Sequence, residues 1–190
     1  MLKIDVSVLN DVNEIDKLCQ EVIDEAVSLQ ETLFYFYDKS DEYKDKMIEL
    51  KEILRLLVKR KYEIQKPSLS DGVIDLYLED TYSYTICEHD ENTPIGSIEY
   101  KFSNHPIPGN ISYEINKNYQ GHHYALRALR LLGRKLLDDG VTTIYITAND
   151  EKNVPSIKTI ERFGGTRYRN EFRYGVVPYI CDLEKIYNKK

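Results

Sequence analysis

One segment of the sequence is suited to binding a phosphorylated ligand, because a polar turn leads directly into a helix. A β-prone stretch, Ile111–Asn116, precedes this turn, which runs Gln120-Gly121-His122-His123-Tyr124-Ala125. The first amides of a helix have no intrahelical acceptor and lie at the positive end of the helix dipole, so they bind anions. Gly121 lets the backbone approach a phosphate closely. The segment therefore predicts a phosphate site at the start of the helix.

This turn differs from the common nucleotide-binding loops. No Gly-Lys-Ser/Thr follows Gly121, as a Walker loop requires, and the three glycines of a dinucleotide fingerprint are absent. A single glycine before a helix is also typical of an ordinary turn. A second segment is therefore needed to support a ligand site, and one lies about thirty residues further on. There Asn153-Val154-Pro155-Ser156 predicts the start of a helix that ends at Gly164-Gly165.

Together the two segments resemble the GNAT superfamily of N-acetyltransferases. The turn at Gln120–Ala125 is similar to the family's pyrophosphate loop, in which Gln/Arg-x-x-Gly-x-Gly/Ala is usual. Asn153–Ser156 followed by Phe163–Gly165 is similar to the family's Asn-x-x-Ser…Gly-Phe helix. The order of elements from about residue 72 onward is also similar, so the resemblance covers about two thirds of the chain.

The resemblance implies an α/β (mixed α+β) protein with the acyl-CoA N-acyltransferase fold. Helices would flank a mixed central sheet that is splayed between the strand ending at Asn116 and the strand ending at Thr147. Acetyl-CoA would be the cosubstrate, with its pantetheine arm in that opening. The implied binding residues are the backbone of Tyr113, Glu114 and Ile115, the amides of Gln120, Gly121, His122, His123, Tyr124 and Ala125, and, near the thioester, Asn153 and Ser156.

Three positions depart from the family pattern. His123 stands where a glycine is usual, although histidine tolerates a left-handed backbone better than most residues. Many family members have a tyrosine seven residues after the asparagine as the acid for the leaving thiolate, and this chain has Ile160 there. Some members place a glutamate base where this chain has Ala148. The resemblance therefore supports cofactor binding more directly than it supports one mechanism.

Proton transfer in such a reaction needs a base for the amine and a donor for the oxyanion. Glu114, on the strand expected beside the thioester, is the first candidate base, and Glu99 on the neighbouring strand is the second. Ser156, Tyr168 and Tyr174 are candidate proton donors to sulfur. A thiolate, with a pKa of about 8.5 in free cysteine, leaves without an obligatory strong acid. Glutamate and tyrosine on strands are also common as solvated and packing residues.

Residues 1–65 are expected to form a helical extension on the N-terminal side of the segments that carry this chemistry. Apolar spacing predicts two amphipathic helices joined by the polar break Asp38–Asp41, with Asn10 or Asp11 as the first cap. The apolar stripes are Val12, Ile15, Cys19, Val22, Ala26, Leu29, Leu33 and Phe36, then Tyr43, Met47, Leu50, Leu54 and Leu57. This antiparallel hairpin is suited to packing on itself, on the later domain, or on a second copy of the chain as a homodimer.

After the linker Lys66–Gly72 the period becomes strand-like, and residues 72–190 are expected to form the GNAT-like domain. A helix from about Gly121 to Asp139, ended by Gly140, is expected to lie on the sheet through its leucines. The expected strands are Val73–Leu78, Tyr82–Cys87, Pro94–Phe102, Asn110–Asn116, Val141–Thr147, Arg167–Tyr174 and Val177–Leu183.

Composition excludes several classes of function. A net charge of −6 argues against nucleic acid as a partner, and Lys59–Lys61 is explained by the end of a helix. No apolar run is long enough to span a membrane and no signal peptide is visible, so no membrane partner and a cytoplasmic location are expected. Cys19, Cys87 and Cys181 lack metal spacing, so buried thiols and no metal are expected. His89 and His105 are expected to have no specific role.

Three functions follow as hypotheses. The leading one is an acetyl-CoA-dependent N-acetyltransferase in which a small-molecule or peptide amine attacks directly, and the acidic net charge favours a cationic acceptor. The alternative is a catalytically silent acyl-CoA-binding regulatory or interaction domain, which Ile160 and Ala148 suggest. A third is an interaction protein in which the hairpin binds the partner and the sheet domain is a scaffold.

Overall fold

The computed structural model describes residues 5–35, 40–102, 109–149, 152–168 and 175–188, apart from the side chains of residues 32–35 and 40–42. The chain divides into two compact units, Met1–Lys66 and Pro67–Lys190. No helix within the described ranges is long and apolar enough to cross a membrane.

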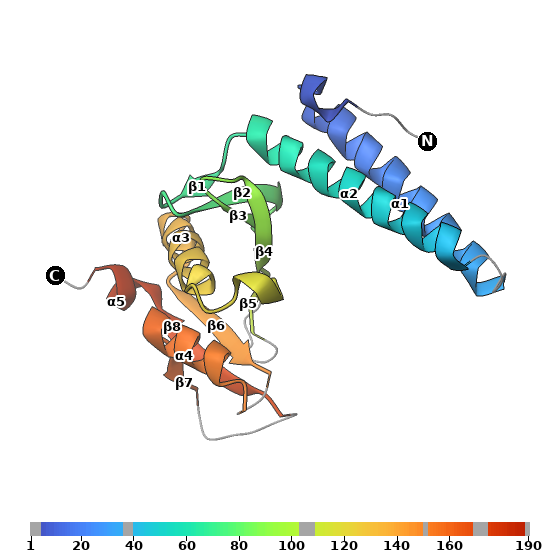
Figure 1. The fold of residues 1–190 in the computed structure, drawn as a ribbon. Coiled ribbons are helices and arrows are strands. Elements are labelled where there is room, and N and C mark those ends of the chain that lie inside the picture. The colour runs from blue at the N-terminus through green and yellow to red at the C-terminus, as the bar shows by residue number, and fades with distance from the viewer. Residues whose placement is uncertain (1–4, 36–39, 103–108, 150–151, 169–174, 189–190) are drawn as a thin grey trace. The chain divides into compact units, whose positions relative to one another are not determined.

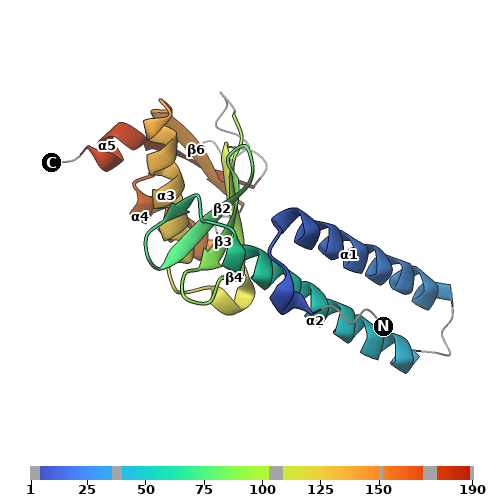
Figure 2. The ribbon, with the colours of Figure 1, turned by 90° about the horizontal axis from the view of Figure 1, so that it is seen from above.

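The first unit is an antiparallel pair of helices, α1 Val12–Tyr35 and α2 Ser40–Ile64, preceded by the short turn η1 Val6–Val8. The two helices lie side by side in both views (Figure 1 and Figure 2). The Asp11 side chain accepts the N–H of Asn13 at 2.8 Å, which confirms the predicted cap.

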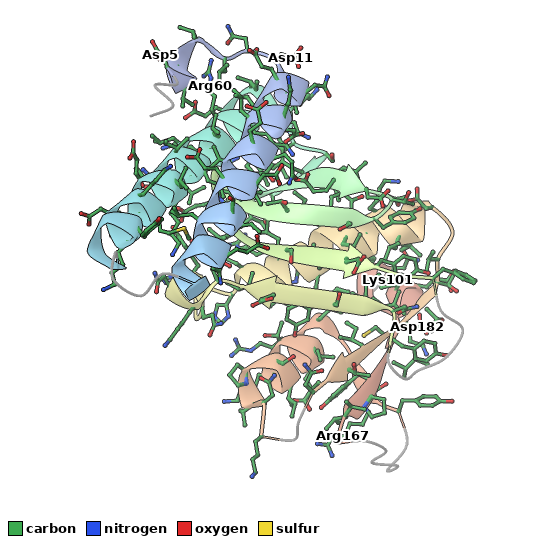
Figure 3. The ribbon with its side chains drawn as sticks, turned by 90° about the vertical axis from the view of Figure 1, so that its right-hand side faces the viewer. Asp5, Asp11, Arg60, Lys101, Arg167 and Asp182 are labelled. Carbon is green, nitrogen blue, oxygen red and sulfur yellow. The ribbon has the colours of Figure 1, made fainter. Side chains whose placement is uncertain are left out.

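Apolar residues of both helices form a core within this hairpin. Its buried members are Leu9, Ile15, Val22, Leu29, Leu50 and Leu57. The apolar stripes therefore pack on each other within the hairpin, which is one of the three packing partners that the sequence allows. Leu33 and Phe36 lie outside the described side chains. Lys46 pairs with Glu25 at 2.7 Å across the two helices. Arg60, from the basic cluster, donates to the Leu9 carbonyl at 2.8 Å, and it lies at the same end of the hairpin as Asp11 (Figure 3).

The second unit is a sheet of eight strands in the order β1-β2-β3-β4-β5-β6-β8-β7. The strands are β1 Leu69–Ser70, β2 Ile74–Asp80, β3 Ser83–Glu88, β4 Thr93–Tyr100, β5 Ile111–Ile115, β6 Thr143–Ala148, β7 Thr166–Arg167 and β8 Val177–Asp182. The helices are η3 Lys117–Tyr119, α3 Tyr124–Asp138, α4 Val154–Phe163 and α5 Leu183–Tyr187. All neighbouring strands are antiparallel except β5 and β6. This mixed sheet confirms the predicted fold class.

Helix α3 is attached to the sheet through its leucines, as its spacing predicts. Leu129, Leu132 and Leu136 are buried in one core with strand residues such as Ile86 and Ile98. Burial of a leucine side chain stabilises the fold by about 1.5–3 kcal/mol. Helix α3 packs against β1, β2 and β5, and α4 packs against α3 and β6 (Figure 1). The two helices are therefore held next to the β5–β6 boundary.

Three local features differ from the sequence expectation. The supposed linker contains β1, whose Leu69 pairs with Leu76, because pairing across strands is not visible in composition. Of the expected strand Arg167–Tyr174, the structure describes only Arg167 and Tyr168. Arg167 belongs to the two-residue strand β7, and Tyr168 lies beyond its end. The chain ends in α5, where the Asp182 side chain accepts the N–H of Lys185 as a cap.

A buried carboxylate, Asp75, is paired with His89. Asp75 is 3% exposed on β2, and its Oδ2 lies 3.0 Å from His89 Nδ1. The hydrogen bond to Asp75, and then the charge of that carboxylate, raises the pKa of His89. His89 therefore has a partner that the sequence does not reveal, since Asp75 lies on β2 and His89 lies in the turn after β3.

This pair predicts a pH-dependent stability. Because the folded pKa of His89 is raised, its contribution is complete below the unfolded pKa of about 6.5 and is lost as pH rises through the folded value. The drop in melting temperature caused by His89→Gln should therefore be larger at about pH 5.5 than at about pH 8.5. In an Asp75→Asn background the pH dependence should vanish. A drop that grows with pH would contradict the account.

Candidate functional site

Strands β5 and β6 are paired at only one register position among the described residues, Ile111 with Ile146. Asn110, which is 5% exposed, forms the joint: its Oδ1 accepts the Tyr145 N–H at 2.7 Å and its own N–H donates to the Tyr145 carbonyl at 2.8 Å. Beyond this point β6 runs at an angle to the strands β2 to β5 (Figure 3). The sheet is thus splayed between the two strands named from the sequence.

One edge of β5 faces this opening. The Asn116 N–H donates to the Ile95 carbonyl on β4 at 2.8 Å. Because backbone groups alternate in direction along a strand, the N–H and C=O of Glu114 also point toward β4. The backbone groups of Tyr113 and Ile115 point the other way, where β6 has departed. The Ile115 carbonyl accepts the Gln120 side chain at 2.9 Å, whereas Tyr113 has no strand partner on that side within the described residues. This edge can pair with an added extended chain.

Gly96 on β4 is a positioning residue that the sequence does not reveal. A Cβ built on it would lie 2.1 Å from the Glu114 carbonyl oxygen, far inside contact distance. Only glycine therefore allows β4 to pack this closely against the part of β5 that borders the opening.

The turn into α3 has the strained backbone that its sequence suggests. Gly121 has a φ of +90° and His123 a φ of 63°, so the expectation that histidine adopts the left-handed conformation is confirmed. The first helical bond runs from the Arg127 N–H to the His123 carbonyl at 3.1 Å. The N–H groups of Tyr124–Leu126 have no acceptor within the described residues. They form an open helix terminus of the kind that binds anions.

The first turn of α3 is anchored to the β2–β3 end of the sheet. The Tyr124 hydroxyl donates to Glu88 at 2.8 Å, and this bond raises the pKa of Tyr124. Arg127 pairs with Asp71 at 2.8 Å. Burial acts to raise the pKa of Asp71, but hydrogen bonds from the Ile74 amide and from Arg127 outweigh it and the pKa is lowered. These contacts fix the direction of the free amides.

A cavity of about 410 Å³ lies at this helix terminus. Among the residues predicted from the sequence, its lining contains Tyr113, Glu114, Ile115, Gln120, Gly121, His123, Tyr124, Ala125, Asn153 and Ser156. His122 is not part of the lining, and its ring stacks on Tyr124 with centroids 5.6 Å apart. The lining also includes residues that the sequence does not single out: Tyr119, Pro155, Lys158, Thr159 and Arg162.

Two of the added residues are cations on one face of α4. Lys158 and Arg162 are four residues apart, and Arg162 Nη1 lies 3.5 Å from His123 Nδ1 of the opposite turn. Their spacing of four residues puts them on one helical face, but Ser156 is two residues from Lys158 and does not share that face, so the sequence alone does not place them at the site. Free amides on one wall and two cations on the other fit a ligand with several phosphates.

A second cavity of about 540 Å³ shares Tyr113, Asn153 and Ser156 with the first. Its other described lining residues are Lys101, Gly109, Asn110, Ile111, Ser112, Thr147, Asn149 and Val176. Asn153 caps α4 by accepting the Ser156 N–H at 3.3 Å. The two cavities therefore meet at the start of α4, beside the opening in the sheet.

The candidate proton-transfer residues lie in different surroundings. Glu114 is exposed and lines the first cavity, whereas Glu99 is paired with Lys101 at 3.0 Å and lines neither cavity. Tyr168 also lines neither; its ring meets Tyr145 edge-on at 5.8 Å. Tyr174 lies outside the described residues. Ile160 is 0% exposed in the core, so that position contributes nothing to the lining.

The two cations on α4 give a testable prediction. Replacing Lys158 and Arg162 by alanine should weaken coenzyme A binding at least about tenfold at low salt, because charge-assisted bonds to phosphate are lost. Titration calorimetry at two ionic strengths measures this, and the salt dependence should also decrease. Arg130→Ala, an exposed α3 residue outside both cavities, is the control and should bind normally. Equal affinity of the double variant and wild type would remove the cations from the site.

Comparison with known proteins gives one family. The model of the acetyltransferase (GNAT) family matches residues 50–165, which is more than half of the 190-residue chain. The matched stretch begins within α2 and ends just after α4. No curated protein is similar enough in sequence to count as a match.

Two solved structures resemble part of the chain. An acetyltransferase from Agrobacterium tumefaciens is 19% identical over 52% of this chain and 59% of its own, with a TM-score of 0.45. A GNAT-family acetyltransferase from Bacillus anthracis is 20% identical over 55% of this chain and 68% of its own, with a TM-score of 0.45. This chain thus spans less than two thirds of the first of these proteins.

Proposed function

Because this chain belongs to the GNAT family of acetyltransferases, we propose that it transfers the acetyl group of acetyl-CoA to a primary amine of a small molecule or peptide. We assign this activity to residues 72–190 and treat residues 1–65 as a helical extension. The observation that supports the proposal most is the cavity that the free amides of Tyr124 and Ala125 share with two cations, Lys158 and Arg162, beside the splayed strands. That arrangement suits a long ligand with phosphates at one end.

The chain's residues fit acetyl-CoA along its length. The α3 terminus with Gly121 and His123 would hold the pyrophosphate, and Lys158 and Arg162 add positive charge beside it. The free backbone edge at Tyr113 would pair with the pantetheine amides like an added strand. The thioester would then lie near the start of α4, where both cavities meet. Acetyl-CoA supplies an activated acyl group, and the protein supplies its position.

The second cavity is proposed to admit the acceptor amine. An amine must lose a proton to attack, and Glu114, which borders the first cavity, is proposed as the base, directly or through water. A β5 N–H that faces the opening would donate to the carbonyl oxygen as negative charge develops there. The groups proposed to act on acetyl-CoA come from β5, from the start of α3 and from α4.

A pair of glycine variants tests cofactor binding. Gly121 and Gly140 both have a φ of +90° and no atom within 4 Å of a built Cβ. Alanine at either position should therefore destabilise the fold by about 1 kcal/mol through the same backbone strain. Only Gly121→Ala should weaken coenzyme A binding, because Gly140 ends α3 and lines neither cavity. Equal binding by both variants would place the cofactor elsewhere.

Thiol release from acetyl-CoA over a panel of amines separates the enzyme from the silent alternative. Release above hydrolysis with at least one amine is expected. Binding of coenzyme A without release for any amine would instead favour an acyl-CoA-binding regulatory domain. Absence of both would favour the interaction protein.

The role of Glu114 is tested by Glu114→Gln. Loss of a general base should lower kcat/KM by about 100-fold or more near neutral pH and remove the acidic limb of the pH profile. Glu99→Gln is the matched control, because Glu99 is ion-paired with Lys101 and lies outside both cavities. An unchanged pH profile in Glu114→Gln would exclude this residue as the base.

A further inference from the structure

Two hydroxyl groups lie at the junction of the two cavities. Tyr113, Asn153 and Ser156 are the described residues that line both cavities. The carboxamide of Asn153 has no proton that it can give up near neutral pH, and its oxygen is used to cap α4. The hydroxyls of Tyr113 and Ser156 are therefore the described proton carriers at this junction.

These hydroxyls are hydrogen-bonded to each other across the opening in the sheet. The Tyr113 hydroxyl oxygen lies 2.8 Å from Ser156 Oγ and 3.5 Å from the Ser156 carbonyl oxygen. Tyr113 belongs to β5 and Ser156 to the first turn of α4, so the pair joins the two sides of the opening. Its position is fixed by the cap on α4 and by the pairing of β5 with β4.

The surroundings suit Tyr113 to donating a proton. Burial raises the pKa of its phenol, so the proton stays on oxygen at neutral pH. The hydrogen bond with Ser156 acts in the opposite direction and lowers the pKa of Tyr113, because the Ser156 hydroxyl is able to donate to the phenolate oxygen and stabilise it. A group that is protonated before the reaction and supported after losing its proton is what a general acid requires.

No other described candidate occupies this junction. Ile160 is buried in the core and carries no exchangeable proton. Tyr168 packs on Tyr145 and lines neither cavity. Glu114 lines the first cavity but not the second.

We propose that the Tyr113 hydroxyl protonates the sulfur that leaves during acyl transfer, and that Ser156 is the positioning residue that supports the phenolate. The step rests on the proposed function. The amine nitrogen bonds to the acetyl carbonyl carbon, the carbon–sulfur bond breaks, and its electron pair stays on sulfur, which takes the Tyr113 proton. The amine's proton passes to the base, and Tyr113 regains a proton from water before the next turnover.

The test compares Tyr113→Phe, Ser156→Ala and Tyr82→Phe in the full chain. Tyr82 lines neither cavity and its hydroxyl donates to Asp139 at 2.7 Å, so it is the matched control for loss of a hydrogen-bonded phenol hydroxyl. Tyr113→Phe should keep coenzyme A affinity within about twofold and lower kcat by about 100-fold or more, as loss of an acid does. Ser156→Ala should lower kcat by about tenfold, the effect of one lost hydrogen bond. Tyr82→Phe should resemble wild type.

A second readout separates acid catalysis from a structural role. A fluorinated tyrosine at position 113 keeps the ring and hydroxyl but has a more acidic phenol. The alkaline limb of the pH–kcat profile should then move to lower pH, whereas a structural hydroxyl would leave that limb in place.

Each result decides between supporting and overturning the proposal. Lost kcat with retained coenzyme A binding in Tyr113→Phe, together with the moved alkaline limb, supports it. Wild-type kcat in Tyr113→Phe overturns it, and so does a loss of coenzyme A affinity that accounts for the whole loss of rate. If the wild type binds coenzyme A but releases no thiol with any amine, the proposed function fails first, and that outcome is visible without any variant.

Discussion

The site depends on one constraint, the single joint that Asn110 makes between β5 and β6. The buried side-chain oxygen of Asn110 accepts the Tyr145 N–H, and the Asn110 backbone N–H donates to the Tyr145 carbonyl. The two strands are paired at Ile111 and at no described position further along β5. Backbone groups without partners are costly when buried, so a splayed sheet needs something to satisfy the exposed edge. Gln120 does this for the Ile115 carbonyl, and the Tyr113 backbone is left for an incoming chain.

The rest of the domain directs two helix starts toward that opening. Ion pairs and hydrogen bonds from Asp71 and Glu88 hold the first turn of α3, while Asn153 shapes the first turn of α4. The amides of α3 and the side chains of α4 then face the same cavity. The fold thereby places the proposed phosphate site and the hydroxyl pair of Tyr113 and Ser156 at opposite ends of one exposed strand edge.

Much of this arrangement is predictable from the sequence because it is local. The left-handed backbone at His123, the leucine face of α3 and the Asn153 cap each follow from a few neighbouring residues. The pairs that complete the site are not local. Arg162 with His123, Tyr113 with Ser156, and Asp75 with His89 each join distant segments, and single-sequence patterns carry no information about such distances. The role of Gly96 is also not predictable from the sequence, because the atom that excludes a side chain there is the Glu114 carbonyl oxygen on another strand.

The central claim is that acetyl-CoA lies against the free edge of β5 and the open start of α3. Amide hydrogen exchange, followed by NMR with and without acetyl-CoA, tests it directly. The amides of Tyr113 and of Tyr124–Leu126 have no acceptor in the part of the chain that the structure describes. The account predicts that they exchange fast in the free protein and become strongly protected on binding. Binding that leaves these amides unprotected, with protection appearing elsewhere in the sheet, would contradict the account.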